Sequence, residues 1–420
     1  MSAASAIPTL RVKQIATKIG SGKTPSGGSE TYSDSGVLFI RSQNVQFGAL
    51  NLTDIVHIND ATHRDMYSTR VHDGDVLLNI TGASLGRVAY YRAELGEANV
   101  NQHVCIIRPQ SSMDTRYLSY ALSSDLCQDQ IAGMQAGGNR DGLNFEQVGG
   151  LRLPVPSLEM QRRIADFLDA EISRLDRLAA LRKRVRELVE LRNERLVDTV
   201  LWSGLSNHKR RTIPLKYLAQ EISVGIVVTP AKWYVDSDGV PALRGINVRP
   251  GHIDLSDLAN ISIEGHTHHS KSRLSVGDVV VVRTGQAGAA AVVPPALNGA
   301  NCIDLIIIRC GSKLSPDYLQ YVINSAHTRN TIAEYSVGSI QSHFNVSSMK
   351  QVGIPCRTRN EQDDIVLEID TSLQQGSNAI ELLRRQEALL SERRKSLVLG
   401  AITGMIDITT ASGRNLTKGI

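Results

Sequence analysis

The chain of 420 residues is poor in aromatic side chains, has few cysteines and contains no long apolar run. Aromatic residues make up only 4% of it, which argues against the stacking surfaces on which proteins hold single-stranded nucleic acid. The cysteines are odd in number and never spaced as CxxC, which predicts neither a zinc knuckle nor a disulfide framework and fits a reducing compartment. They are Cys105, Cys127, Cys302, Cys310 and Cys356.

No stretch approaches the roughly 18 apolar residues in a row that a membrane helix needs. The N-terminus also has no basic segment followed by an apolar one, so we expect neither a membrane span nor secretion, and a cytoplasmic location. The formal charge of +4, from 46 basic and 42 acidic side chains, is typical of an ordinary mixed surface and indicates no partner by itself.

What the sequence does contain is a long internal repeat. RSQNV at 41–45 returns as RGINV at 244–248, and GDVLL at 74–78 returns as GDVVV at 277–281, both 203 residues later. YLSYALSS at 117–124 returns as YLQYVINS at 318–325, and LPVP at 153–156 returns as IPCR at 354–357, both 201 residues later. Gln161 and Ile164 follow the first copy as Gln362 and Ile365 follow the second. The period is too long for a solenoid, and each copy is large enough to bury its own core.

Each globular stretch leads into a long charged segment with helical periodicity. Between Glu159 and Leu201 there is neither glycine nor proline, and apolar residues recur at steps of three or four. That spacing predicts one helix, roughly 65 Å long at a rise of 1.5 Å per residue, which is longer than one domain needs for its own core. The predicted apolar stripe is Ile164, Leu168, Ile172, Leu175, Leu178, Leu181, Val185, Leu188 and Leu191.

The second copy offers a partner helix from about Asn360 to Leu399, in which Gly376 weakens the middle. Two such helices can pair within one chain, and an antiparallel coiled coil would place the two domains at opposite ends, related by an approximate two-fold axis. Alternatively, each helix caps its own domain, or the helices mediate homodimerisation. The apolar positions of the second helix are Ile365, Ile369, Leu373, Ile380, Leu383, Leu390 and Leu397.

Short β-branched runs separated by glycine-rich connections predict strands in each globular half. Tyr117–Gln130 and Tyr318–Tyr335 predict a helix that follows the strands. The expected fold class is therefore α+β, with two mixed α/β domains that are each followed by a long helix. The predicted strands are residues 37–41, 75–81, 104–109, 279–284 and 304–310.

Several motifs that suggest catalysis lack the context that catalysis needs. GSGKT at 20–24 resembles a phosphate-binding loop, but Thr17 stands in place of its first glycine and Pro25 follows instead of a helix. We expect no strand leading into Gly20, which argues against a dinucleotide-type or S-adenosylmethionine-binding turn. The adenine methyltransferase signature and a nuclease carboxylate cluster are also missing. HTHH at 266–269 is more typical of a hydrated loop than of a metal site, so we predict no catalytic residue and no metal.

As an ordered set, the repeated strings resemble those of a known family, the specificity (S) subunits of type I restriction-modification systems. The set runs from GSGKTPSGG through FIRSQNV, GDVLLNITGASLGRVAY, QHVCIIRP and YLSYAL to LRLPVPSLEMQRRIADFLDAEISRLD, and it returns in weaker form. The resemblance covers nearly the whole chain. The second copy departs from it in ISVGIVVTP at 222–230 and in TRNEQDDI, which implies that the two halves read different sequences.

The resemblance implies a non-catalytic protein that reads a bipartite, asymmetric site on double-stranded DNA. Its helical spacers would set the gap between half-sites and bind two copies of a DNA adenine methyltransferase subunit and, through the complex, restriction or translocase subunits. S-adenosylmethionine, ATP and Mg are expected on those partners, with no cofactor on this chain. The implied parts are target-recognition domains at 1–158 and 205–358, helical spacers at 159–204 and 359–406, and a tail at 407–420.

Polar loops beside the repeated strands are the predicted DNA contacts, because polar and basic side chains bind base edges and phosphates. Each of these residues could instead cap a turn, and the repeated Arg41 and Arg244 could form structural ion pairs. Arg140 and Gln341, which differ between the copies, suit sequence reading better. The predicted contacts are Lys23, Thr24, Arg41, Gln43, Asn44, Thr81, Ser84, Arg87, Asn139, Arg140 and Asn144 in the first half, and Arg244, Asn247, Arg283, Thr284, Gln286, Ser339, Gln341, Ser342, His343 and Asn345 in the second.

Two other classes of function stay open at this point. An enzyme with its own methyl-transfer or nuclease activity is disfavoured by the missing motifs, and cofactor titration on the isolated chain would test it. A coiled-coil interaction scaffold that never binds DNA is the other alternative. Salt-dependent binding to duplex DNA in the presence of partners would separate that scaffold from a DNA-reading subunit.

Overall fold

The computed structural model describes residues 7–135, 142–202, 212–285, 287–336 and 344–408. The chain forms two compact units, one of residues 1–183 with 384–420 and the other of residues 184–383. Each unit contains one globular domain and part of each long helix.

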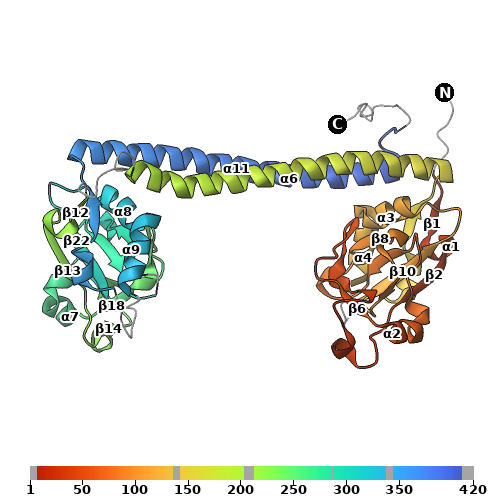
Figure 1. Ribbon diagram of the computed structural model, residues 1–420, viewed down its shortest axis with the longest axis horizontal. Coiled ribbons are helices and arrows are strands. Elements are labelled where there is room, and N and C mark those ends of the chain that lie inside the picture. Colours follow the sequence, from red (N-terminus) through yellow and green to blue (C-terminus); the bar gives the residue numbers. More distant parts are fainter. Residues whose placement is uncertain (1–6, 136–141, 203–211, 286, 337–343, 409–420) are drawn as a thin grey trace. The chain divides into compact units, whose positions relative to one another are not determined.

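An antiparallel four-stranded sheet forms the centre of the first unit (Figure 1). Its inner strands begin with apolar runs, Val76–Leu78 and Val104–Ile107, whose side chains are buried, as a sheet covered on both faces requires. Leu78 and Cys105 lie in one apolar cluster and Leu77 and Ile106 in another, because successive side chains of a strand point to opposite faces. In spatial order the strands are β2 (Ala16–Ser21), β10 (Val104–Pro109), β7 (Val76–Asn79) and β8 (Val88–Tyr90).

Smaller sheets and short helices complete this unit. A three-stranded sheet consists of β6 (Val56–Ile58), β3 (Val37–Ile40) and β9 (Ala98–Val100), in which β3 and β9 are parallel. Two further pairs are β1 (Thr9–Arg11) with β11 (Arg152–Pro154), and β4 (Val45–Gln46) with β5 (Ala49–Leu50). The short helices are α1 (Val12–Ile15), α2 (Asp60–Asp65), α3 (Thr115–Ser123), α4 (Asp125–Gln135) and α5 (Phe145–Gly150).

The second unit repeats the topology of the first. Its central sheet has the order β13 (Glu221–Val224), β22 (Leu305–Arg309), β19 (Val279–Val282) and β20 (Ala290–Val292), which is the order of the equivalent strands in the first unit. Its other strands are β14 (Tyr234–Val235), β18 (Ala259–Ile261), β15 (Val240–Leu243) and β21 (Asn301–Cys302) in one sheet, β12 (Thr212–Pro214) with β23 (Gly353–Pro355), and β16 (Val248–Arg249) with β17 (His252–Ile253). Its short helices are α7 (Ile263–His268), α8 (Pro316–Asn324), α9 (Ala326–Ser336) and α10 (Val346–Met349).

All five predicted strands are present, but each helix predicted within a globular half, at 117–130 and at 318–335, is two helices. The break falls at Ser124 in the first unit and at Ser325 in the second, where the backbone is extended. Each serine hydroxyl donates to the carbonyl three residues earlier, Ala121 or Val322, which also accepts from the backbone N of the same serine, so both groups close the helix end. The apolar periodicity continues through both breaks, which is why periodicity predicted a single helix.

Each long helix is fastened to its domain by a buried glutamine. Gln161 accepts from Asp114 N at 2.8 Å and donates to the carbonyls of Ser112 and Pro156. Gln362 makes the equivalent three bonds in the second unit, to Ser315 N and the carbonyls of Lys313 and Arg357. The recurrence of this glutamine in the repeat therefore has a structural cause. The helices it fastens are α6 (Leu158–Trp202) and α11 (Arg359–Thr403).

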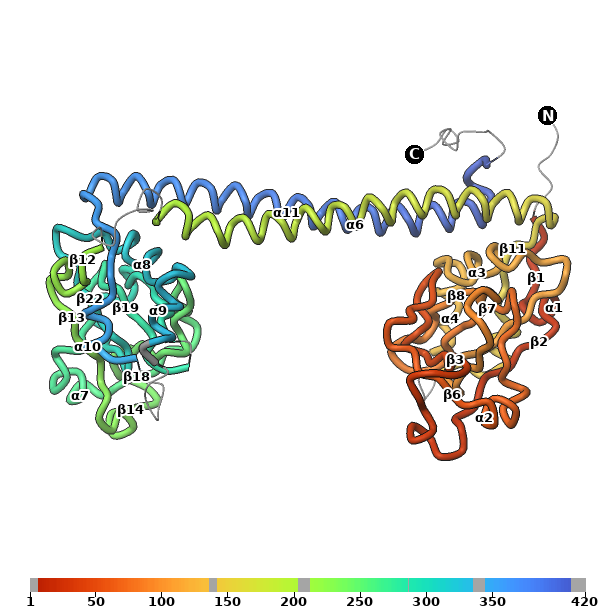
Figure 2. Tube along the Cα trace, in the orientation of Figure 1, coloured from red at the N-terminus to blue at the C-terminus, as the bar shows by residue number. Residues whose placement is uncertain are grey.

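The two long helices run antiparallel in both units. In the first unit, Ile172 of α6 shares an apolar cluster with Val398 near the end of α11. In the second unit, Leu201 near the end of α6 shares a cluster with Ile369 near the start of α11. Figure 2 shows the opposed directions by colour, with the yellow start of α6 beside the violet end of α11 in the first unit. The predicted antiparallel pairing is therefore confirmed.

The seam between the helices is not the stripe predicted from the sequence. It passes through Ala179 and Asn193 of α6, which are less exposed than the leucines near them. Gly376 of α11 is buried opposite Asn193, and a Cβ at position 376 would lie 2.3 Å from Asn193 Nδ2. This glycine is therefore a point of close helix approach rather than a weak point. Five residues of the predicted stripe are left exposed, by 38 to 64%: Leu178, Leu181, Val185, Leu188 and Leu191.

None of the helices in the described residues has a span apolar enough to cross a membrane.

Two buried cysteines make the stability of the first unit sensitive to alkaline pH. Burial raises the pKa of the Cys105 and Cys127 thiols from 9.0 to about 12. Because the folded pKa is the higher one, the unfolded chain loses these protons first as the pH rises. Stability is therefore full below about pH 9 and falls as the pH approaches 12, by at most about 1.4 kcal/mol per pH unit for each thiol.

Urea denaturation at about pH 7.5, 9 and 10.5 measures that slope. We expect Cys105→Ala with Cys127→Ala to flatten it. Cys356→Ala, which replaces an exposed cysteine, is the control that should leave it unchanged. A slope that is the same in the double variant and the parent chain would contradict this assignment.

Candidate nucleic-acid interface

Four of the predicted DNA contacts surround one hollow of about 350 Å³ in the first unit. Three of them come from the loop between β7 and β8, and Gln43 comes from the turn after β3. Asn79, which is buried in β7, donates from Nδ2 to Ser42 O at 2.7 Å and so holds this turn beside the loop. The hollow is lined by Ser42, Gln43, Thr81, Gly82, Ala83, Ser84, Arg87 and His103.

The side chains around this hollow are mostly free to bind a ligand. The guanidinium of Arg87 makes no hydrogen bond or ion pair with any residue that the structure describes. The Ser84 backbone accepts from Arg87 N at 3.1 Å, which closes the loop without using either side chain. Arg87 therefore offers a complete guanidinium fork, the group that binds phosphates and guanine edges in pairs of hydrogen bonds.

One wall of the hollow is a chain of side-chain hydrogen bonds. Thr24 Oγ1 donates to Gln102 Oε1 at 2.6 Å, and Gln102 Nε2 lies 3.1 Å from His103 Nε2. His103 Nδ1 in turn bonds to Thr81 Oγ1. The chain joins two predicted contacts, Thr24 and Thr81, through Gln102 and His103, which were not predicted as contacts although they stand in the quoted string QHVCIIRP.

A glycine brings the loop of Thr24 to this wall. A Cβ added to Gly22 would lie 1.7 Å from Val100 O, so only glycine fits against that backbone. Gly225 packs in the same way against Cys302 in the second unit, 203 residues later. The second copy therefore keeps this glycine although its surrounding loop differs. A strand, β2, does lead into Gly20, contrary to the sequence-based expectation. It is an edge strand of an antiparallel sheet, and the loop after it leads to a single 3₁₀ turn, Gly28–Thr31, rather than to an α-helix.

The equivalent corner of the second unit has different chemistry. Thr284 and Arg283 both bond to the carboxylate of Asp304, with Arg283 Nη1 at 2.7 Å and Thr284 Oγ1 at 3.4 Å. Asp304 has a left-handed backbone with φ of 52°, which is uncommon for a residue other than glycine and is held here by its neighbours. Residue 289, which precedes β20 as Arg87 precedes β8, is a buried alanine.

Four of the predicted contacts hold turns of the backbone. Asn44 and Asn247 are only 2% exposed, and each accepts from the backbone N of the arginine three residues earlier. Arg41 and Arg244 reach from the same turns to the carbonyls of Asp54 and Asp257. Buried asparagine side chains cannot reach a base edge, so we leave Asn44 and Asn247 out of the candidate interface; Arg41 and Arg244 brace the same turns.

Other predicted contacts have local bonds of their own. Lys23 Nζ donates to Asp65 O at 3.1 Å, on the exposed surface. Asn144 and Asn345 cap the starts of α5 and α10, where each side chain accepts from a backbone N at 2.8 Å. Seven predicted contacts lie outside the described residues: Asn139, Arg140, Gln286, Ser339, Gln341, Ser342 and His343.

The HTHH motif is accounted for by packing. His266 bonds through Nδ1 to Asn301, as His63 bonds to Asn99 in the first unit. His268 and His269 lie against the ring of Trp233, at centroid distances of 5.5 Å. The described residues contain no group of three histidine, cysteine or carboxylate side chains placed to hold a metal ion.

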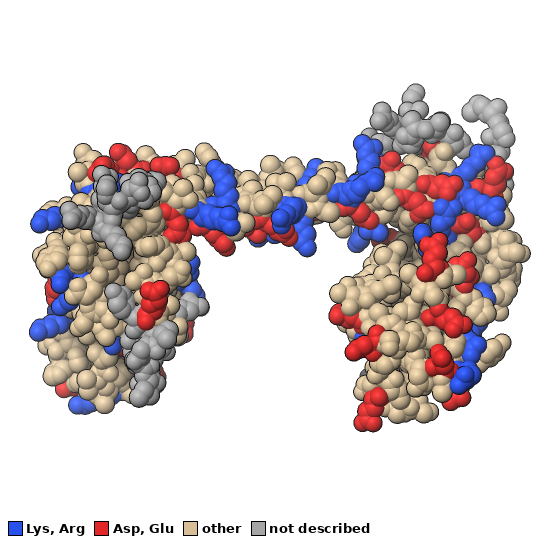
Figure 3. Space-filling view, viewed as in Figure 1, with Lys and Arg blue, Asp and Glu red and all other residues tan. Residues whose placement is uncertain are grey.

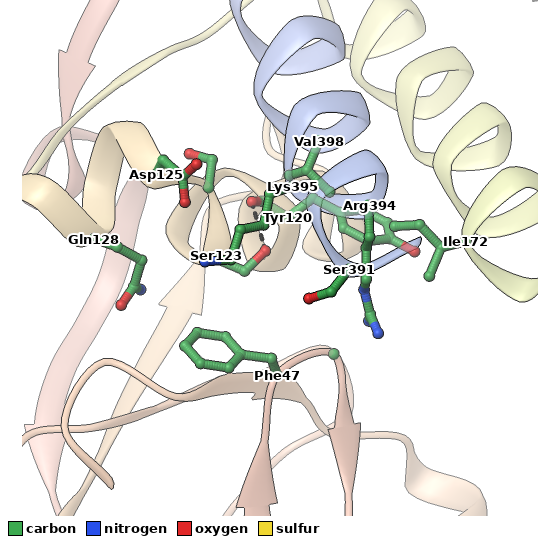
Figure 4. A pocket seen from close by; sticks show the side chains of 12 residues that line it. Phe47, Tyr120, Ser123, Asp125, Gln128, Ile172, Ser391, Arg394, Lys395 and Val398 are labelled. Carbon is green, nitrogen blue, oxygen red and sulfur yellow. Dashed lines mark hydrogen bonds between the residues drawn. The ribbon is translucent and has the colours of Figure 1, made fainter. Parts of the chain in front are cut away.

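A second hollow in the first unit, of about 360 Å³, lies between the globular domain and the long helices (Figure 4). Figure 4 shows Phe47 on one side and Ser391 and Arg394 of α11 on the other. Arg394 Nη1 donates to Asp176 Oδ1 at 3.0 Å, so this arginine serves the helix pairing. On the helices, basic and acidic side chains are mixed rather than gathered into a field of one sign (Figure 3).

Sequence comparison finds known proteins to which this chain is similar. Residues 8–190 match the family described as type I restriction modification DNA specificity domain. The chain is similar to the type I restriction enzyme EcoKI specificity subunit of Escherichia coli K12, with 20% identity over 309 residues that cover 70% of this chain and 66%, just under two thirds, of that protein. It is also similar to the StySPI specificity subunit of Salmonella potsdam, with 20% identity over 349 residues that cover 79% of this chain and 74% of that protein.

Two solved structures share the fold. One, from work on complex assembly and conformational transition of the type I R-M system, has a TM-score of 0.69 at 19% identity over 94% of this chain and 97% of its own. The HsdS subunit from Thermoanaerobacter tengcongensis has a TM-score of 0.61 at 18% identity over 96% of this chain and 99% of its own. By its matched domain and its sequence relatives, the chain is similar to the specificity subunits of type I restriction-modification systems. It also shares the fold of the two solved structures.

Proposed function

We propose that this chain is the non-catalytic DNA specificity subunit of a type I restriction-modification complex. Each domain would read one half of a bipartite, asymmetric site on double-stranded DNA. The chain would bind two copies of a DNA adenine methyltransferase subunit and, through the complex, restriction or translocase subunits. S-adenosylmethionine, ATP and Mg would be held by those partners.

The observation that carries the proposal is a difference between two like domains. The central sheets have the same strand order, yet the corner at the end of β7 holds Arg87 and His103 whereas the equivalent corner holds Asp304. A shared scaffold with different polar side chains at one place suits the reading of two different base sequences. Two identical surfaces related by two-fold symmetry would instead suit a palindromic site.

The exposed apolar residues of α6 support the docking of partner subunits. Leu178 and Leu181 lie on the part of α6 in the first unit, and Val185, Leu188 and Leu191 on the part in the second. Large apolar side chains that stand exposed along one helix face mark a surface that another protein covers. One such segment on each unit is consistent with two partner copies.

We expect Leu181→Lys with Leu188→Lys to weaken partner binding at least about 30-fold, because each change places a charge in an apolar contact. Ala180→Lys, at an exposed position of the same helix, is the matched control and should bind like the parent chain. Both variants should keep the parent's unfolding temperature, since Leu181 and Leu188 are 64 and 48% exposed. Equal partner binding by the double variant and the control would remove α6 from the docking surface.

The proposal is tested by tagging the chain in its native host and measuring the mass and subunit ratio of the complex that co-purifies. Two adenine methyltransferase copies per chain, and loss of one bipartite methylated motif from the genome when the gene is deleted, are the expected results. A homodimer that binds neither methyltransferase nor duplex DNA would establish the scaffold alternative instead.

A further inference from the structure

We propose that Thr81 and Arg87 form a base-reading site in the first domain that presents hydrogen-bond donors, and that His103 and Gln102 are positioning residues that orient the Thr81 hydroxyl. The inference rests on the proposed function and deepens it. It commits the site to a guanine in one half of the DNA sequence.

The hydrogen-bond chain fixes which atoms donate. The amide oxygen of Gln102 accepts from Thr24, so its amide nitrogen, which has only donors, faces His103 Nε2. His103 Nε2 must therefore be the acceptor, and the ring proton is on Nδ1. His103 Nδ1 then donates to Thr81 Oγ1. Because the Thr81 oxygen accepts in this bond, the hydroxyl hydrogen of Thr81 is not used in it and is left for another acceptor.

The hollow thus presents hydrogen-bond donors from two sides. Thr81 offers one hydroxyl hydrogen, and Arg87 offers a guanidinium that no described residue engages. In the major groove a guanine edge presents two acceptors, O6 and N7, and arginine binds them with two parallel hydrogen bonds. Adenine presents an amino group beside N7, which an arginine fork does not match. The donor set therefore favours a G·C pair at this position.

The second unit provides the internal contrast. In place of Gln102 and His103 it has Asp304, whose carboxylate accepts from Arg283 and Thr284. In place of Arg87 it has the buried Ala289. The described part of this corner therefore offers acceptor oxygens where the first unit offers donors, so a change of chemistry at one corner should leave the other half-site unaffected.

The test is methylome sequencing of complexes that carry single variants, with partner subunits present. Thr81→Val and Arg87→Met should each relax one G·C position of one half-site, lowering the preference for that pair by roughly 5- to 150-fold. Thr81→Ser keeps the hydroxyl and should keep the preference. Thr284→Val, the matched change in the second unit, should leave the half-site read by the first domain unchanged. His103→Phe keeps the ring but not the bonds, and should relax the same position as Thr81→Val.

Synthetic duplexes give a second readout that a merely structural role would not change. Replacing the guanine at that position with 7-deazaguanine removes N7 and should weaken binding by the parent complex but not by Arg87→Met. Full preference in both Thr81→Val and Arg87→Met, or relaxation of an A·T position, would overturn the inference while the proposed function stands. An equal loss of methylation at every sequence would also overturn it, because it would assign these residues to phosphates. Absence of a methylated motif with the parent chain would instead count against the proposed function.

Discussion

Replacing Arg108 with methionine is expected to lower the free energy of unfolding of the first unit by about 3–5 kcal/mol. Arg108 donates from Nε and Nη2 to the two carboxylate oxygens of Asp75, at 2.7 and 2.8 Å. The Asp75 side chain is 0% exposed, so the substitution leaves a buried carboxylate without its ion-pair partner. Its remaining support is one hydrogen bond from the backbone N of His72 and the charge of Lys18, which makes no ion pair with it. Urea denaturation followed by circular dichroism measures the loss.

The equivalent ion pair in the second unit supplies the control. Arg309 lies 3.6 Å from the buried Asp278, and its shorter ion pair is with Glu221, which is 46% exposed. Burial raises the pKa of Asp278, so this carboxyl takes up a proton more easily and relies less on a neighbouring cation. We expect Arg309→Met to cost less than about 2 kcal/mol. Equal losses in the two variants would contradict the argument that the close two-bond pairing of Arg108 with a buried carboxylate sets the cost.

Adding seven residues to each long helix is expected to lengthen the gap between the two DNA half-sites by about three base pairs. Seven residues add roughly 10.5 Å of helix at 1.5 Å per residue, and base pairs are spaced about 3.4 Å apart. Insertions after Lys183 in α6 and after Leu383 in α11 fall where the compact units divide, so each unit keeps its own contacts. A seven-residue step also keeps the apolar seam on one face. Methylome sequencing reads the gap directly.

The sequence of each half-site should stay the same in this variant, because the domains are unchanged. An insertion in α6 alone is the control. It shifts α6 against α11, so that pairs such as Ile172 with Val398 no longer meet, and we expect loss of folded complex rather than a new gap. Methylation of the original motif by the double insertion would show that the helices do not set the spacing.

Much of the fold was predictable because the repeat constrains the same residues twice. The runs of Val279–Val282 and Leu305–Arg309 form the inner strands, since continuous β-branched residues suit a strand buried on both faces. Gln161 and Gln362 could be recognised as a recurring pair, but their role in fastening domain to helix depends on carbonyls brought together by folding. The helix breaks at Ser124 and Ser325 were missed, because apolar periodicity does not report a local change of backbone.

The candidate site was predictable only in part. Four of the polar loop residues that the sequence predicts as DNA contacts line one hollow, namely Gln43, Thr81, Ser84 and Arg87, and their contact with DNA stays a prediction. Asn44 and Asn247 are as polar as the residues that line the hollow, yet their side chains are buried and hold turns. Polarity alone does not distinguish a side chain that binds a ligand from one that satisfies its own backbone.

The sequence by itself determined that two similar domains recur through the repeat, where their main strands lie, and that there are two long helices, because local propensity and periodicity control these features. Only the tertiary structure decided which face of α6 forms the seam: the leucines from Leu178 to Leu191 have the right spacing, yet they are exposed beside it. The tertiary structure also decided that Gln102 and His103 join Thr24 to Thr81. A hydrogen bond needs atoms within about 3 Å. Residues so far apart in the chain reach that distance only because Gly22 lets two loops meet.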